Sequence, residues 1–89
     1  MAGIVRHAHA GTLESSDVYV ELAPGREGIE LELESPVIGQ FGDEIRAAVL
    51  ETLHEQDLDC AWVRLVDRGA LDCVIRARVE TAARRAKEG

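Results

Sequence analysis

The chain has few of the residues from which most substrate pockets are built. Of its 89 residues one is Trp, one is Tyr and one is Phe. Because aromatic side chains line most small-molecule pockets, this composition argues against a sizeable substrate site. No apolar run approaches the roughly 18 residues that cross a bilayer, and the first ten residues lack the basic start and apolar stretch of a signal peptide. We therefore expect a cytosolic protein without a membrane segment.

Cysteine and positive charge are also scarce. Cys60 and Cys73 are too far apart for a paired metal-binding or redox motif, and each lies in an apolar pattern, so we expect two buried free thiols. Seventeen acidic residues against ten basic ones give a net charge of -7, which disfavours nucleic acid as a partner. The acidic excess lies in residues 1–59 and the basic excess in residues 60–89. This split suits docking onto larger proteins, although solvated faces would also explain it.

Length and periodicity predict one small α+β domain. The chain is long enough for a single modest core. Residues 1–12 show no apolar period and are expected to be a flexible N-terminal arm, followed by the folded domain over residues 13–89. Alternating apolar side chains predict strands over 18–22 and 29–34, joined as a hairpin, and a short third strand over 61–66.

Apolar residues recur at helical spacing in two further segments. The first follows the Ser35–Pro36 pair, whose hydroxyl can cap a helix, although Asp43 is an alternative cap, and it ends near Gln56. The last segment alternates over 71–79 as a strand would, but its length and its basic C-terminal end favour a helix. The predicted order is β-β-α-β-α, a mostly antiparallel sheet covered on one face by two helices.

His7 and His9 are the only closely spaced typical metal ligands. A pair one residue apart can coordinate a metal if a third ligand comes from elsewhere, but two solvated imidazoles explain them without further residues. His54, on the first helix, has no reason to meet them. A serine-hydrolase constellation and a phosphate-binding glycine loop are both absent. The sequence therefore assigns no catalytic residue and no metal site.

The stretch ESSD, residues 14–17, places two serines between acids just before the first predicted strand. Short hydroxyls in such a place often bond nearby backbone groups in a turn or strand-start cap. An exposed hydroxyl there is also a possible attachment point that can enter another enzyme's active site. The residues alone leave both interpretations open for Ser15 and Ser16.

Three stretches together resemble the acyl carrier protein, or gamma subunit, family of citrate lyase. They are AGTLESSD at 10–17, QFGDEIRAAVLETL at 40–53 and DRGALDCVIRARVETAARRA at 67–86, in the family's order and at its spacing. In that family a serine in the TLES stretch carries 2'-(5''-phosphoribosyl)-3'-dephospho-coenzyme A through a phosphodiester. By position that serine is Ser15. The family commonly has glycine next, where this chain has Ser16, which stays the fallback site.

The resemblance implies a carrier subunit that catalyses no step itself. Its arm would hold acetyl and citryl thioesters while larger transferase and lyase subunits convert citrate to acetate and oxaloacetate. A separate transferase would attach the arm, and the carrier would work in a hetero-oligomer. The similar carriers of malonate decarboxylase and citramalate lyase remain alternatives. An alternative of another class is a small regulatory module phosphorylated on Ser15 or Ser16.

Several charged residues are expected to serve this role. Glu14 and Asp17 would repel the polyanionic arm from the carrier's own surface. The alternating glutamates of the strand over 29–34 would form an acidic ridge that steers partners, or only a solvated sheet face. The arginines of the last segment would make a second contact or balance acids within the fold.

Overall fold

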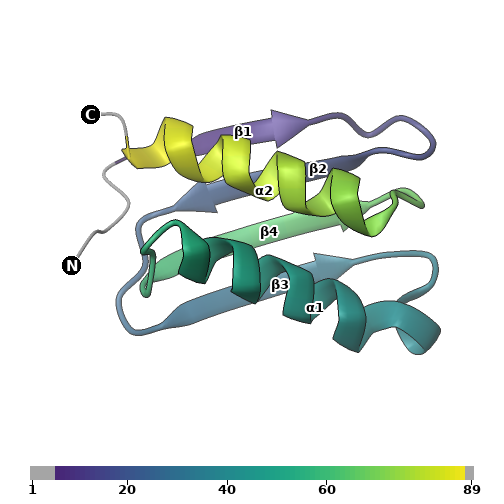
Figure 1. Cartoon of the computed structure of the whole chain (residues 1–89), viewed down its shortest axis with the longest axis horizontal. Coiled ribbons are helices and arrows are strands. Elements are labelled where there is room, and N and C mark those ends of the chain that lie inside the picture. The colour runs from purple at the N-terminus through teal and green to yellow at the C-terminus, as the bar shows by residue number, and fades with distance from the viewer. Residues whose placement is uncertain (1–5, 88–89) are drawn as a thin grey trace.

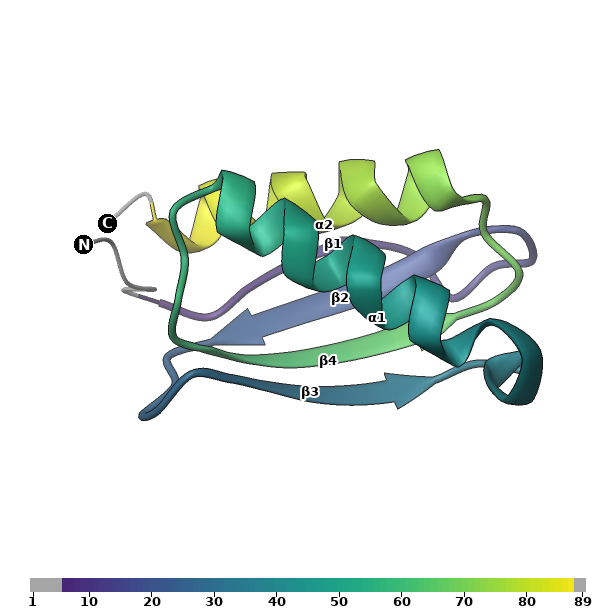
Figure 2. The same cartoon turned by 60° about the horizontal axis from the view of Figure 1, so that its bottom comes forward.

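A four-stranded sheet with two helices on one of its faces makes up the domain (Figure 1). The computed structural model describes residues 6–87. The elements along the chain are β1 (Ala8–Gly11), β2 (Val18–Ala23), β3 (Ile29–Glu34), α1 (Ile38–Glu55), β4 (Ala61–Asp67) and α2 (Asp72–Lys87). Figure 2 shows both helices on the same side of the sheet, which leaves the other face open. The predicted α+β class and the predicted layers are confirmed, with β1 as an additional strand.

β4 is one of the two interior strands, with a partner along each edge and an apolar side that faces the helices. The sheet order is β1-β2-β4-β3, and β4 runs antiparallel to β2 and parallel to β3. Val63 is fully buried and lies between Leu22 of β2 and Leu31 of β3. Burying a large aliphatic side chain stabilises the fold by about 1.5–3 kcal/mol. Such rows across three strands therefore fix the position of β4.

The predicted hairpin between β2 and β3 is wrong, because β4 inserts between them. The apolar alternation fixes which face of a strand is buried but not which strand lies beside it. The connection between β2 and β3 crosses the start of β4, where the Ala61 amide donates to the Gly28 carbonyl at 3.1 Å. A Cβ at Gly25 would lie 2.7 Å from the Ala61 carbonyl carbon, so this crossing requires glycine.

Part of the expected flexible arm is a strand. β1 pairs antiparallel with β2, and Ala10 lies opposite Val20 and is buried. Alanines gave no recognisable apolar period, yet small side chains suit this position because α2 packs over β1 (Figure 1). The expectation over residues 1–12 is therefore corrected for 8–11. Residues 1–5 of the expected arm lie outside the described part of the chain.

α1 ends one residue before the predicted Gln56, but neither of the two predicted cap residues stands at its start. The residue preceding the helix is Val37, and neither Ser35 nor Asp43 caps it. Instead, the Ser35 hydroxyl accepts a hydrogen bond from the Val37 amide at 3.2 Å and so closes the turn before the helix. The predicted helical stripe is buried in its C-terminal two thirds only.

α2 confirms the helix over the alternative strand. Its buried side chains recur at helical spacing and include Ile75, Val79, Ala82 and Ala86. Basic residues occupy its last turn, where they complement the helix dipole. Within the described residues, neither helix combines the length and the apolarity that crossing a membrane requires.

The expectation of two buried thiols is wrong for Cys73, which is exposed, and holds only in part for Cys60, which is half-buried. Cys73 lies in the first turn of α2 and its neighbour Ile75 faces the core. The apolar residues around Cys73 alternate in sequence, but a period of 3.6 residues turns the thiol outward.

Replacing Cys73 with serine should change the free energy of unfolding by less than about 0.5 kcal/mol, because the side chain is solvated. The same change at half-buried Cys60 should cost more. Urea denaturation of both variants measures the difference. In the folded protein, a thiol reagent should modify Cys73 faster than Cys60, and equally slow modification of both would contradict the exposure of Cys73.

Candidate functional site

Ser15 lies at the tip of a tight turn between β1 and β2. The Asp17 amide donates to the Glu14 carbonyl at 3.1 Å, so Ser15 and Ser16 are the two central residues of a four-residue turn. Both serines are exposed. Neither hydroxyl makes a hydrogen bond within the described part of the chain; the side chains that bond locally are those of Thr12 and Asp17. The turn interpretation of ESSD is correct, but its hydroxyls do not cap it.

Ser16 adopts the left-handed backbone conformation that favours glycine, with a φ of 66°. A turn with positive φ at its third residue alone is of type II, and glycine is the usual residue there. The glycine that the resemblance implies at this position would suit this backbone conformation. The Ser16 amide donates to the Arg68 carbonyl at 2.8 Å, which fixes the backbone despite the unfavourable conformation.

Asp17 anchors both ends of the turn and connects them to α2. Its Oδ2 accepts a hydrogen bond from the Thr12 hydroxyl at 2.7 Å, and its Oδ1 accepts one from the Val18 amide at 2.7 Å. The Arg78 guanidinium donates to both oxygens, each at 3.1 Å. The Thr12 hydroxyl, the Val18 amide and Arg78, in that order, lower the pKa of Asp17 to about 2.

This anchoring corrects the expectation that Glu14 and Asp17 together repel an anionic arm. The Asp17 side chain is only 14% exposed, and Arg78 pairs with its charge bidentately. Glu14 is exposed and forms no ion pair with any of residues 6–87. Of the two acids, Glu14 alone presents an uncompensated charge beside the serines.

The base of the turn has no room for a side chain on β1. Gly11 has a φ of 89°, and a Cβ there would lie 1.8 Å from the Val18 carbonyl oxygen. On the other side, the Arg68 amide donates to the Asp17 carbonyl at 2.9 Å and so extends the pairing of β2 with β4. The turn is therefore a fixed base with an unconstrained tip.

A buried carboxylate, Asp67, organises the adjoining loop between β4 and α2. Asp67 is 2% exposed. Its Oδ1 accepts from the amides of Gly69 at 3.1 Å and Ala70 at 2.9 Å, and its Oδ2 accepts from the Ser35 hydroxyl at 2.7 Å. Sequence reasoning missed Asp67. An aspartate two residues before Gly69 is typical of an Asx turn, and this pattern could have identified it.

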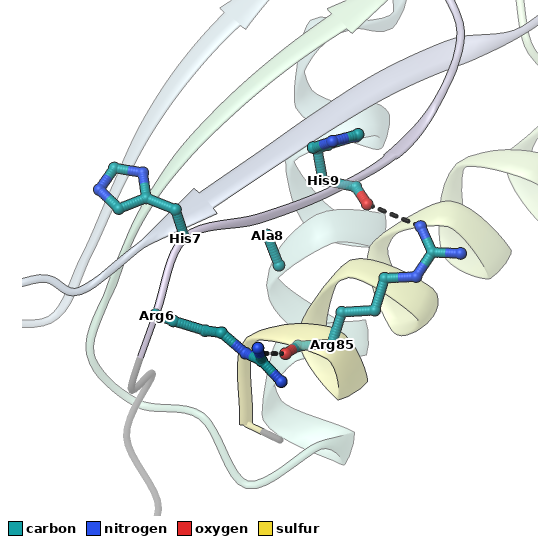
Figure 3. Close-up of a pocket in the computed structure, with 5 residues that line it drawn as sticks. All are labelled: Arg6, His7, Ala8, His9 and Arg85. Atoms are coloured by element: carbon teal, nitrogen blue, oxygen red, sulfur yellow. Dashed lines mark hydrogen bonds between the residues drawn. The ribbon is translucent and has the colours of Figure 1, made fainter. Parts of the chain in front are cut away.

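His7 and His9 lie just before and within β1, away from the serines. Figure 3 shows them around a shallow pocket with Arg6 and Arg85, and Arg85 Nη1 donates to the His9 carbonyl at 2.9 Å. The His9 and Tyr19 rings lie close together in a tilted arrangement, with centroids 5.8 Å apart and an interplanar angle of 32°. Among residues 6–87 no group of three His, Cys, Asp or Glu side chains could hold a metal ion.

The charged residues expected to contact partners divide into two groups. The alternating acids of β3 are exposed, on the opposite side of the strand from its apolar residues that pack against the core; they are Glu30, Glu32 and Glu34. The basic residues of α2 mostly balance acids within the fold. Arg76 pairs with Asp72 and Glu51, at 2.6 and 3.0 Å, and Arg84 pairs with Glu80 at 3.0 Å.

Comparisons with known proteins identify the family. Residues 5–86 match the family model described as Malonate decarboxylase delta subunit (MdcD). The citrate lyase acyl carrier protein of Lactiplantibacillus plantarum is 54% identical over 91% of this chain and 84% of that protein. The chain belongs to the citrate lyase acyl carrier protein family. The protein of that name from Enterobacter sp. (strain 638) is 52% identical over 96% of this chain and 88% of its own length. These relatives confirm the predicted family.

The fold of this carrier family member is also found in a solved structure. One chain in the crystal structure of a Pseudomonas malonate decarboxylase hetero-tetramer in complex with malonate superposes with a TM-score of 0.80. The match covers 96% of this chain and 88% of that chain at 22% sequence identity. At this identity the likeness shows the fold alone, which two largely different sequences share.

Replacing Asp17 with asparagine should destabilise the domain in a pH-dependent way. Because the pKa falls from 3.8 to about 2 on folding, the ionised carboxylate stabilises the native state above about pH 4, and this contribution is lost as the pH falls toward 2. The variant should lose about 1–2 kcal/mol of unfolding free energy at neutral pH, and the difference should shrink in acid.

Urea denaturation at about pH 7, 4 and 2.5 measures this difference. Glu14→Gln is the matched control, since Glu14 is the exposed acid of the same turn, and it should stay within about 0.5 kcal/mol of wild type. A difference between wild type and Asp17→Asn that does not change between neutral pH and acid would contradict the role of the charge.

Proposed function

We propose that the chain is the acyl carrier subunit of a citrate lyase and that Ser15 carries 2'-(5''-phosphoribosyl)-3'-dephospho-coenzyme A through a phosphodiester. Membership of the carrier family supports a covalently attached group. The observation that supports Ser15 is its exposed hydroxyl at the tip of an anchored turn, where its amide, unlike that of Ser16, makes no backbone hydrogen bond to the loop between β4 and α2. A hydroxyl in this position is open to an attaching enzyme.

The turn fits a large covalent group better at Ser15 than at Ser16. The Ser16 amide lies 2.8 Å from the Arg68 carbonyl, so a group on Ser16 would start beside the loop between β4 and α2. Ser15 has no such neighbour among the backbone hydrogen bonds of the described chain. A group attached there needs no pocket, and none of the anchoring contacts of Asp17 would have to break.

The group, when bound, supplies a thiol that carries acetyl or citryl groups. The chain's own residues would hold its attachment point: Thr12, Asp17 and Arg78 fix the base of the turn while the tip stays free. A tether of this kind replaces free diffusion by a high effective concentration at each partner site. The chain itself would catalyse no step of the conversion of citrate to acetate and oxaloacetate.

The proposed partners are larger transferase and lyase subunits and the transferase that attaches the arm. The likeness to a chain of a malonate decarboxylase hetero-tetramer supports assembly with larger subunits. The net charge of -7 opposes a nucleic-acid partner. This hetero-oligomer would lie in the cytoplasm.

A second candidate is the carrier of malonate decarboxylase, because the matching family model and the similar solved structure both bear that name. Relatives at about half identity are named for citrate lyase, which favours the first candidate. Turnover of citrate, citramalate and malonate by the reconstituted complexes separates these carriers. A phosphorylated regulatory module would instead gain only the mass of phosphate.

Ser15→Ala should abolish attachment of the arm, because the acceptor hydroxyl is lost. Co-expression with the attaching transferase, followed by intact mass and peptide mapping, measures this directly. Wild type should gain one group on the peptide that contains Ser15. Full modification of Ser15→Ala together with none of Ser16→Ala would reverse the assignment.

Ser16→Gly is the matched variant, and it should keep full modification. It should also raise the free energy of unfolding by about 0.5–1 kcal/mol, because glycine adopts a φ of 66° without the strain that serine carries. Thermal or urea unfolding beside the mass measurement tests both effects. A variant that unfolds more readily than wild type would contradict the assigned turn geometry.

A further inference from the structure

Exposed apolar side chains gather at the end of the domain that carries Ser15. Among residues 6–87 five large apolar side chains are exposed, and four of them lie at this end: Leu13, Ile38, Phe41 and Leu71. The turn between β1 and β2 lies there, and both helices begin there (Figure 1). Leu50, the fifth, lies further along α1. Exposed apolar surface concentrated in one place is typical of an interaction site.

A pocket of about 380 Å³ opens within this apolar end. Its walls come from the first turns of α1, the loop between β4 and α2, and the first turn of α2. Phe41 and Ile45 line it from α1, and Leu71 and Ile75 line it from the other side. Leu71 is 71% exposed and Phe41 is 46% exposed, so both offer apolar area that a partner could cover.

The loop between β4 and α2 lines the pocket and also contacts the Ser15 turn. Arg68 of this loop makes backbone hydrogen bonds to Ser16 at 2.8 Å and Asp17 at 2.9 Å. The next residues of the loop, Gly69 and Ala70, line the pocket. A molecule seated in the pocket would therefore lie one loop away from Ser15 without covering it.

The charges of the pocket favour a cationic partner. Its lining includes Glu44, Asp67 and Asp72 and contains neither Lys nor Arg. Arg76 pairs with Asp72 at 2.6 Å, whereas the hydrogen-bond donors to Asp67 are all neutral. An arm with phosphates, or a cargo with carboxylates, would be repelled here. An apolar side chain flanked by Lys or Arg complements both the lining and its charge.

We propose that this pocket and its apolar rim dock the larger enzyme subunit that receives the arm, through an apolar side chain flanked by basic residues. The inference rests on the proposed function, because the arm on Ser15 determines which partner must approach this end. Docking beyond the loop between β4 and α2 would leave the Ser15 tip free and set a fixed starting point for the arm. The carrier would then deliver its thiol over a short, defined distance.

The affinity of the carrier for the purified larger subunits tests this surface. Phe41→Ala combined with Leu71→Ala should weaken binding about tenfold or more, because truncating central apolar contacts of an interface usually costs that much. Leu71→Ala alone is a second variant that should still fold, because this side chain is mostly solvated and does not contribute to the core. Weaker binding by this variant would therefore report on the interface. Leu50→Ala, at the exposed apolar residue outside this end, should bind within about twofold of wild type.

The charge is tested separately by Glu44→Lys, which should weaken binding about tenfold and reduce its salt dependence. Glu32→Lys, at an exposed acid of β3, makes the same charge change away from the pocket and should have a smaller effect. Equal losses from both variants would show general steering by net charge and overturn the assignment to this pocket.

Intact mass of each sample distinguishes a failure of the proposed function from a failure of the docking surface. A wild-type chain that gains no arm would overturn the proposed function, and the inference with it. An arm-bearing chain whose Phe41 and Leu71 variants bind as tightly as wild type would overturn the docking surface alone. NMR shifts of Phe41 and Leu71 on arm loading, without any partner, would show that the arm occupies the pocket and would also overturn it.

Discussion

The presentation of the serine turn depends on the hydrogen bonds and the ion pair that the Asp17 carboxylate makes. The carboxylate joins Thr12 before the turn, Val18 after it and Arg78 on α2, which lie far apart in the sequence. Because Arg78 compensates its charge and neutral donors satisfy its remaining lone pairs, the half-buried group stabilises the turn where an unpaired one would destabilise it. The tip at Ser15 can then remain exposed without loosening the domain.

Two buried or half-buried carboxylates thus fix two neighbouring loops at this end of the sheet. Asp17 fixes the turn between β1 and β2, and Asp67 fixes the loop between β4 and α2 through two backbone amides and the Ser35 hydroxyl. The backbone hydrogen bonds of Arg68 connect the two loops. A rigid base, a free hydroxyl and an adjacent apolar pocket suit the proposed carrier role, in which the chemistry would take place on other subunits and the carrier would contribute position.

The sequence predicted what depends on local periodicity. The strand faces of β2, β3 and β4 and the helical stripe of α2 follow from apolar spacing. The attachment site at Ser15 comes from the resemblance over three stretches and stays a prediction. Strand order could not be predicted, because alternation does not show which strands lie side by side. The predicted hairpin of β2 and β3 was therefore wrong. The Cys73 thiol was wrongly predicted to be buried, because the apolar residues around it fit both the period of a strand and the period of a helix. The anchoring pair of Asp17 and Arg78 spans 61 positions, and no local pattern contains it.

A crystal structure of the arm-bearing chain would test the attachment at Ser15 directly. It should show density continuous from Ser15 Oγ into a phosphate, with the Asp17–Arg78 ion pair and the hydrogen bond from the Ser16 amide to the Arg68 carbonyl unchanged. This result would establish that the group joins a turn already formed by the chain. Density on another residue, or a turn whose Asp17 contacts are broken by the attached group, would contradict it.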